Sequence, residues 1–256
     1  MKYYEEFVKL GCFTFDEAVA LVGNDNAALQ LLRDYVKKKH IAKVRKGLYV
    51  ALSMVDGEPV SNKFVIASKL SDTAAVSHHS AFEYYGYANQ VSYEVTVSSK
   101  SRFNPFEFNG ISYERIAPSI SQGVKHNADG VTVTDIERTV LDSINDFENN
   151  MGFEELIQCI TSIPILNEDK MLHYLEEYDK CFLYQKTGYI FSMLQNEFGI
   201  SDSFLKTCKM KSGSSSRYLV KGTRGGQTDF NNYWHLTMPK NYWQNITGGG
   251  DINAII

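Results

Sequence analysis

Seven Lys or Arg side chains and one acid crowd into residues 33–46 of this 256-residue chain, although the whole chain has a net charge of −4. Residues 1–52 hold nine Lys and Arg against six Asp and Glu, a net charge of +3, so the remaining residues hold −7. Clustered cations suit phosphate groups, because each cation that neutralises a phosphate releases a condensed counterion. The sequence therefore predicts one local surface for a polyanion.

Helical spacing arranges part of this charge on one face. Asn24 is suited to cap a helix that runs to about residue 39. Its apolar stripe would be Ala28, Leu31, Leu32, Tyr35 and Val36. The opposite face would present Asn26, Gln30, Arg33 and Lys37, four side chains with hydrogen-bonding or cationic heads.

The elements around this helix predict a winged helix-turn-helix. A helix over about residues 2–10 precedes a second helix, which a Thr14/Glu17 capping box opens and Gly23 ends. After the basic helix, residues 41–51 read as a hairpin that turns at Lys46-Gly47, with Lys43 and Arg45 on the same side of its first strand. In this arrangement the second helix of the motif enters the major groove and the wing contacts phosphate.

The predicted contact set with double-stranded DNA therefore combines the helix face and the wing. It consists of Asn26, Gln30, Arg33, Lys37, Lys38, Lys39, Lys43, Arg45 and Lys46. Seven cations would engage about four to six phosphates per protomer. The alternative is a solvated helix face, since lysine runs are common on protein surfaces.

The segment 53–62 is polar, contains Gly57 and Pro59, and reads as a linker, which predicts a DNA-binding domain over residues 1–56 and a larger mixed domain over 60–256. The overall class is α+β. In the larger domain we expect helices near 62–70, 80–87, 134–144, 152–162, 168–179, 182–198 and 202–211, and strands near 73–77, 91–98, 110–117 and 130–133. The last 45 residues read either as strands, with 217–220 and 233–237 favoured, or as a partly ordered arm.

Two further groups of residues invite a chemical interpretation. Asp135, Arg138 and Asp142 fall at i, i+3 and i+7 on a helix, which fits either an internal charge network or a charged contact surface for a partner. A metal-dependent nuclease would use the two aspartates as ligands. His78-His79 is the other group, but adjacent side chains at a strand end point in opposite directions and no carboxylate or Cys lies at ligand spacing, so we expect no metal site.

Other features set the expected class of protein. The four cysteines are scattered without metal or disulfide spacing, and no apolar run is long enough to cross a membrane. No phosphate-binding loop, nucleophile elbow or Cys/His pair with supporting context is present. We expect a soluble cytoplasmic protein that is not an enzyme, needs no cofactor and has no membrane partner.

Four short stretches together resemble the AbiEi family of antitoxins from bacterial abortive-infection systems. They are TFDEA (14–18) with VRKGLYV (44–50), SHHSA (77–81) with YGY (85–87), VTDIERTVLD (133–142), and Tyr218-Leu219 with Trp234 and Pro239. The resemblance extends nearly from end to end of the chain, and none of the matching motifs is catalytic.

The resemblance implies the antitoxin of a type IV toxin-antitoxin system involved in phage defence. The winged helix would bind inverted repeats in its own promoter as an autorepressor. The larger domain would counter a nucleotidyltransferase-like toxin without needing a stable complex, and Asp135, Arg138 and Asp142 would then be the candidate toxin-neutralising surface. A ligand-responsive winged-helix regulator with no toxin partner is the alternative, and the identity of the neighbouring gene separates the two.

Overall fold

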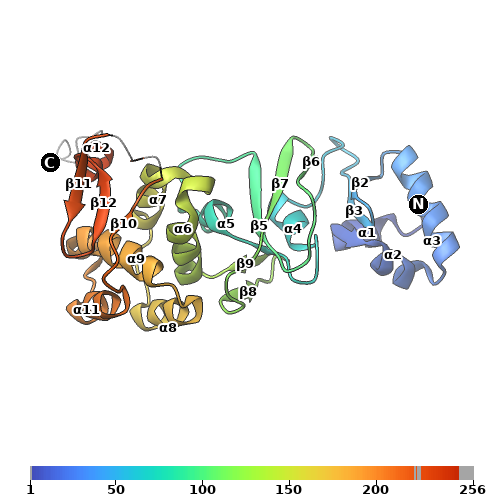
Figure 1. Ribbon diagram of the computed structural model, residues 1–256. Coiled ribbons are helices and arrows are strands. Elements are labelled where there is room, and N and C mark those ends of the chain that lie inside the picture. Colours follow the sequence, from blue (N-terminus) through green and yellow to red (C-terminus); the bar gives the residue numbers. More distant parts are fainter. Residues whose placement is uncertain (1, 222, 224–225, 248–256) are drawn as a thin grey trace. The chain divides into compact units, whose positions relative to one another are not determined.

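The computed structural model describes residues 2–221, 223 and 226–247, which form two compact units (Figure 1). The first unit contains residues up to 76 together with 92–118 and 124–133, and the second contains 77–91, 119–123 and the residues from 134 onward. The first unit thus includes the predicted winged helix-turn-helix and a sheet beyond it. The α+β class predicted from the sequence is confirmed.

The N-terminal part of the first unit has the order of elements of a winged helix-turn-helix (Figure 1). Its elements are α1 (Tyr4–Leu10), β1 (Cys12–Thr14), α2 (Phe15–Val22), α3 (Asp25–Lys37), β2 (Ile41–Arg45) and β3 (Leu48–Ala51). The three strands form an antiparallel sheet in the order β1-β3-β2. The sequence did not predict β1, because three residues after Gly11 carry too little pattern.

Local sequence explains where α2 and α3 begin and end. The predicted capping box is present, since Thr14 N donates to Glu17 Oε2 at 2.7 Å and Glu17 N donates to Thr14 Oγ1 at 3.2 Å. Gly23 ends α2 with a φ of 85°, a left-handed conformation that glycine adopts without steric cost. Asn24 then caps α3, its Oδ1 accepting from Ala27 N at 3.0 Å. These signals fix the turn between the two helices.

The rest of the first unit is a six-stranded mixed sheet with the strand order β6-β7-β5-β4-β9-β8. The strands are β4 (Ala75–Val76), β5 (Glu94–Ser98), β6 (Phe106–Phe108), β7 (Ile111–Ile116), β8 (Val124–His126) and β9 (Thr132–Thr134), with the helix α4 (Lys63–Ser68) preceding them. β5 pairs parallel with β7, and β4 pairs parallel with β9. The short edge strands β6 and β8 were not predicted from the sequence.

The second unit is mainly helical. Its elements are α5 (His78–Tyr85), α6 (Ile136–Asn150), α7 (Gly152–Thr161), α8 (Glu168–Tyr178), α9 (Cys181–Met193), α10 (Gln195–Phe198), α11 (Asp202–Lys211), α12 (Tyr242–Thr247), β10 (Arg217–Tyr218), β11 (Thr228–Asn231) and β12 (Leu236–Pro239). The single helix predicted over 182–198 is split into α9 and α10. The strand predicted at 233–237 lies at β12 instead, and residues 248–256 of the predicted C-terminal arm lie outside the described residues.

A large apolar core joins these helices to the small C-terminal sheet. Trp234 is 2% exposed and its indole lies against Gly188 in the middle of α9, where an added Cβ would come within 2.1 Å of the ring. Glycine is therefore required inside this helix despite its low helical propensity. Among the described helices, none combines the length and the apolar character that crossing a membrane requires.

Candidate nucleic-acid interface and the buried charge network

The predicted reading face of α3 lies on the outside of the first unit. Asn26, Gln30, Arg33 and Lys37 are all exposed, whereas Ala28, Leu32 and Tyr35 on the other side of the helix are buried. The predicted apolar stripe is wrong in one place, because Val36 is 38% exposed at the edge of the helix. The helix thus presents one polar and cationic face to solvent.

Further cations continue this exposed set beyond the end of α3. Lys38, Lys39, Lys43 and Lys46 are exposed in the helix end, β2 and the hairpin turn. Within the described residues, neither these lysines nor Arg33 or Lys37 forms an ion pair. Six of the seven clustered cations are therefore solvated and are not neutralised by neighbouring carboxylates.

Arg45 differs from the other six cations. A β-bulge between Lys43 and Arg45 breaks the strict alternation expected for this strand and changes the direction of the second side chain. The Arg45 guanidinium lies 5.3 Å from the centre of the Phe103 ring and 5.7 Å from that of Phe106. Its Nη1 atom is buried and makes no hydrogen bond within the described residues. Arg45 therefore packs the wing against aromatic rings of the first unit, and its availability to phosphate is lower than that of Lys43.

Gln30 is partly engaged along the helix. Its Nε2 donates to Asp34 Oδ1 at 3.1 Å, and both residues are exposed. Asp34 is the single acid of the cluster, and its position one turn after Gln30 and next to Arg33 reduces the positive potential at that end of the face. The cationic surface is consequently strongest toward the C-terminal end of α3.

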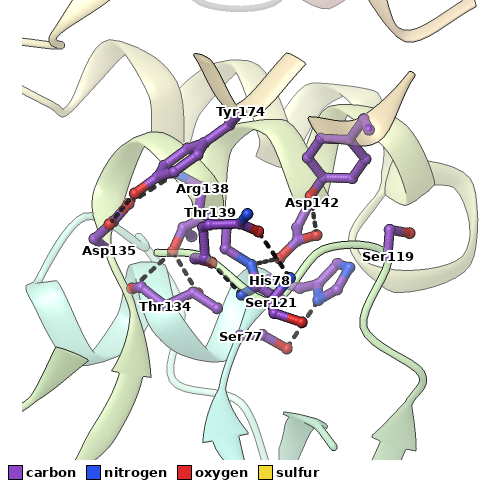
Figure 2. Close-up of polar contacts among 12 residues, drawn as sticks. Ser77, His78, Ser119, Ser121, Thr134, Asp135, Arg138, Thr139, Asp142 and Tyr174 are labelled. Carbon is purple, nitrogen blue, oxygen red and sulfur yellow. Dashed lines mark hydrogen bonds and ion pairs between the residues drawn. The ribbon is translucent and has the colours of Figure 1, made fainter. Parts of the chain in front are cut away.

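Asp135, Arg138 and Asp142 lie inside the second unit, with exposed fractions of 2%, 1% and 5% (Figure 2). Asp135 is the N-cap of α6 and its Oδ1 accepts from Arg138 N at 3.1 Å. Arg138 Nε donates to Asp142 Oδ2 at 3.2 Å, one helical turn further on. An exposed toxin-contact surface at these three residues, one of the two interpretations of the sequence, does not match their burial.

Two tyrosines from α8 complete the network. Tyr174 donates its hydroxyl proton to Asp135 Oδ2 at 2.7 Å (Figure 2). Tyr178 likewise donates to Asp142 Oδ1. Burial, with the carboxylate of Asp142 beside it, raises the pKa of Tyr178 well above its usual value, so this phenol remains a proton donor. The network therefore links α6 to α8 and leaves the carboxylates occupied by protein donors.

Cations also engage the N-terminal end of this network. Lys170 Nζ lies 3.1 Å from Asp135 Oδ2 and 2.8 Å from Glu137 Oε2. Arg138 Nη1 donates to the backbone oxygen of Gln122. Because Asp135 and Asp142 are each bound to internal donors, they do not form the open carboxylate pair that a metal-dependent nuclease would need.

The two adjacent histidines have different surroundings. His78 is buried, has a φ of 55°, and its Nδ1 lies 2.9 Å from Ser77 Oγ (Figure 2). Burial lowers the pKa of His78, which favours the neutral imidazole. His79 instead places its Nε2 3.2 Å from Glu155 Oε1, and Cys159 Sγ lies 3.5 Å from the same oxygen. The prediction of no metal site considered only residues near His79 in the sequence, and the fold brings Glu155 and Cys159 of α7 to it.

Comparison with known proteins establishes the fold. No protein-family model matches the sequence, and no curated protein matches it. Among solved structures, the crystal structure of the RV2827C protein from Mycobacterium tuberculosis is similar, with a TM-score of 0.66 and 10% sequence identity. The similarity covers 97% of this chain and 94% of that chain. The chain therefore shares the fold of that protein along nearly its whole length.

Proposed function

We propose that this protein is a DNA-binding autorepressor whose first unit reads double-stranded promoter DNA through the exposed face of α3 and contacts phosphate through the hairpin. The observation that carries the proposal is a set of six exposed cations on a helix and a hairpin in winged helix-turn-helix order, none of which forms an ion pair with another residue that the structure describes. Solvated cations cost little to bring to a phosphate backbone, and each one that neutralises a phosphate releases a counterion. Inverted repeats in the promoter would place two protomers on one operator.

A second part of the proposal concerns the rest of the chain, which we propose acts as the antitoxin of a type IV system against a nucleotidyltransferase-like toxin. It rests on the resemblance of the SHHSA, VTDIERTVLD and C-terminal stretches to AbiEi antitoxins. The DNA contact depends on the exposed cations of α3 and β2, whereas the proposed toxin neutralisation depends on the rest of the chain. The two activities can therefore be separated by substitution.

The DNA contact is tested with the full chain and two fluorescent duplexes. One duplex carries the region upstream of the protein's own gene, and the other is a shuffled sequence of the same composition. Fluorescence anisotropy should show tighter binding to the upstream duplex. In cells, the protein should repress a reporter gene placed behind the same upstream region. Equal affinity for both duplexes would reject a sequence-specific repressor.

A matched pair of variants ties the binding to the proposed face. Replacing both Lys37 and Lys43 with Gln should weaken binding to both duplexes. Replacing Lys125 and Lys206 with Gln removes the same charge from two exposed residues elsewhere and should leave binding unchanged. Equal losses in the two variants would mean that overall charge, and not this face, controls the affinity.

The antitoxin role is tested by co-expression with the nucleotidyltransferase-like gene encoded beside it. The full chain should restore growth, and the Lys37→Gln/Lys43→Gln variant, expressed from an unrelated promoter, should restore it equally. Failure of both proteins to restore growth, while the unaltered chain still binds the promoter, would reject the antitoxin role and favour an ordinary winged-helix regulator. The absence of a nucleotidyltransferase-like gene beside it would likewise favour the ordinary regulator.

A further inference from the structure

His79, Glu155 and Cys159 form a cluster of metal-ligating groups in the second unit, away from the proposed DNA contacts. His79 is the second residue of α5, and the other two residues lie one turn apart on α7. One nitrogen, one carboxylate oxygen and one sulfur from these side chains all lie within 4.8 Å of one another. Three different donor types thus converge from two helices that are distant in the sequence.

The spacing of the cluster fits a zinc ion. Zinc binds His nitrogen at about 2.0–2.1 Å and Cys sulfur at about 2.3 Å in tetrahedral geometry, which places neighbouring ligand atoms about 3.3–3.6 Å apart. The observed separations are 3.2 Å between His79 Nε2 and Glu155 Oε1 and 3.5 Å between Cys159 Sγ and the same oxygen. Two of the three distances therefore need only small side-chain adjustments.

The surroundings also suit an ion with one position open to solvent. The Cys159 residue is 0% exposed, while the side chains of His79 and Glu155 are 13% and 17% exposed. Because two of the three side chains are partly exposed, a water molecule can supply the fourth ligand, as in zinc sites with three protein ligands. Mixed nitrogen, oxygen and sulfur donors favour zinc over magnesium or calcium, which prefer oxygen ligands alone.

Hydrogen bonding alone also satisfies these three groups. The Cys159 thiol donates to Glu155, and burial together with that carboxylate raises the pKa of the thiol, so without an ion it remains protonated. The structure therefore permits both a simple hydrogen-bonded trio and a metal centre. These alternatives differ in one measurable respect, since only the metal centre contains a metal-thiolate bond.

We propose that His79, Glu155 and Cys159 bind one Zn²⁺ ion that links the start of α5 to α7, with water as the fourth ligand. The ion would bind the folded state and not the unfolded chain, so it would stabilise the second unit. This site is independent of the proposed DNA contact, so an absence of Zn²⁺ binding would leave the DNA-binding proposal unchanged.

The experiment uses the full chain, without an affinity tag and after treatment with a chelator. Co²⁺ is the probe, because a cobalt-thiolate bond gives a charge-transfer absorption and tetrahedral cobalt gives intense visible bands. Titration should give one cobalt per chain with both features, and added Zn²⁺ should displace the cobalt. Zn²⁺ should also raise the thermal unfolding midpoint.

Three variants identify the ligands. Cys159→Ser should abolish the charge-transfer band, and His79→Gln should weaken Zn²⁺ binding at least tenfold. Cys181→Ser, which changes the exposed cysteine, should leave both signals intact. His79 is partly exposed, so His79→Gln should fold even if Cys159→Ser does not. In that case the Zn²⁺ affinity of His79→Gln tests the site. Absence of the charge-transfer band in the wild type, or its loss in Cys181→Ser and not in Cys159→Ser, would overturn the proposal.

Discussion

Arg33 on α3 and Arg138 on α6 show two opposite uses of the same side chain. Arg33 is exposed and forms no ion pair within the described residues, although Asp34 follows it in the sequence. Arg138 is 1% exposed, pairs with Asp142, and donates to the backbone of Gln122. The first remains available to a ligand, whereas the second is committed to the interior of its unit.

The difference follows from the cost of removing a charge from water. A buried guanidinium must find fixed partners, and once it has them the loss of one partner leaves an uncompensated charge. An exposed one is solvated, so substituting it changes stability little. Charge alone therefore does not mark a functional residue in this chain, and exposure distinguishes the two roles.

The largest expected effect compares these two arginines directly. Arg138→Met should lower the free energy of unfolding by about 3–5 kcal/mol, because Asp142 loses its buried cation. Arg33→Met should change it by less than about 0.5 kcal/mol. Urea unfolding measures both changes in free energy, provided that the variants have the same m-value as the unaltered protein. Similar losses at the two positions would contradict the different roles assigned to Arg33 and Arg138.

Lys186 offers a second buried cation with a different kind of support. Its Nζ donates to the backbone oxygens of Ile144 at 3.3 Å and Asn145 at 3.0 Å. It also lies 4.9 Å from the centre of the Phe147 ring and 4.8 Å from that of Phe182. Unlike Arg138, it has no carboxylate within ion-pair distance among the described residues.

Burial lowers the pKa of Lys186 from 10.5 to about 8. The nearby charges of Lys221 and Lys180 also lower this pKa, whereas those of Glu148 and Asp146 raise it. Between pH 8 and 10.5 the unfolded chain therefore retains a proton that the folded chain has lost. Stability should rise with pH across this window, by up to about 3 kcal/mol relative to a Lys186→Met variant. Urea unfolding of both proteins at several pH values measures the difference, and a constant difference would show that the amine titrates normally.

Two positions within the exposed cluster should separate base reading from phosphate binding. Arg33→Ala should cost about 1–3 kcal/mol on the preferred duplex and relax the base preference, because Arg33 lies in the centre of the reading face. Lys46→Ala, in the hairpin turn, should weaken binding to all sequences alike. Anisotropy on the upstream and shuffled duplexes measures both, and equal losses on both duplexes from the two substitutions would reject this division.

The smallest effect concerns the cap that orients α3. Asn24→Ala removes the acceptor for Ala27 N and should lower the free energy of unfolding by about 1 kcal/mol. Asn24→Asp retains an acceptor at the same place and is the control. Chemical unfolding of the three proteins gives the result, and an unchanged stability in Asn24→Ala would mean that the cap contributes little.

Local signals in the sequence predicted much of the first unit. Thr14, Gly23 and Asn24 fix their turns by their own side chains or backbone conformations, so the boundaries of α2 and α3 follow from neighbours in the sequence. The ring of Phe103 that Arg45 packs against lies nearly sixty positions later, and no local pattern reveals this contact or the bulge beside it. Strands as short as β6 and β8 are defined by their partners and not by their own composition.

The same limit applies to the two polar clusters of the second unit. The spacing of Asp135, Arg138 and Asp142 on one helix predicted that they would interact, but their burial depends on the packing of α8. Glu155 and Cys159 lie at i and i+4 on α7, a spacing visible in the sequence. Their proximity to His79, 76 residues before Glu155, is a property of the tertiary fold.

The proposed DNA contact is tested most directly by the salt dependence with which the full chain binds the upstream duplex. Contacts with about four to six phosphates per protomer predict a plot of log affinity against log salt with a slope of about −4 to −5 per protomer. Lys37→Gln/Lys43→Gln should reduce the size of this slope by about 2, while Arg45→Gln should change it less than either lysine does. A slope near zero, or one that the two lysine substitutions leave unchanged, would contradict the assignment of this face to DNA.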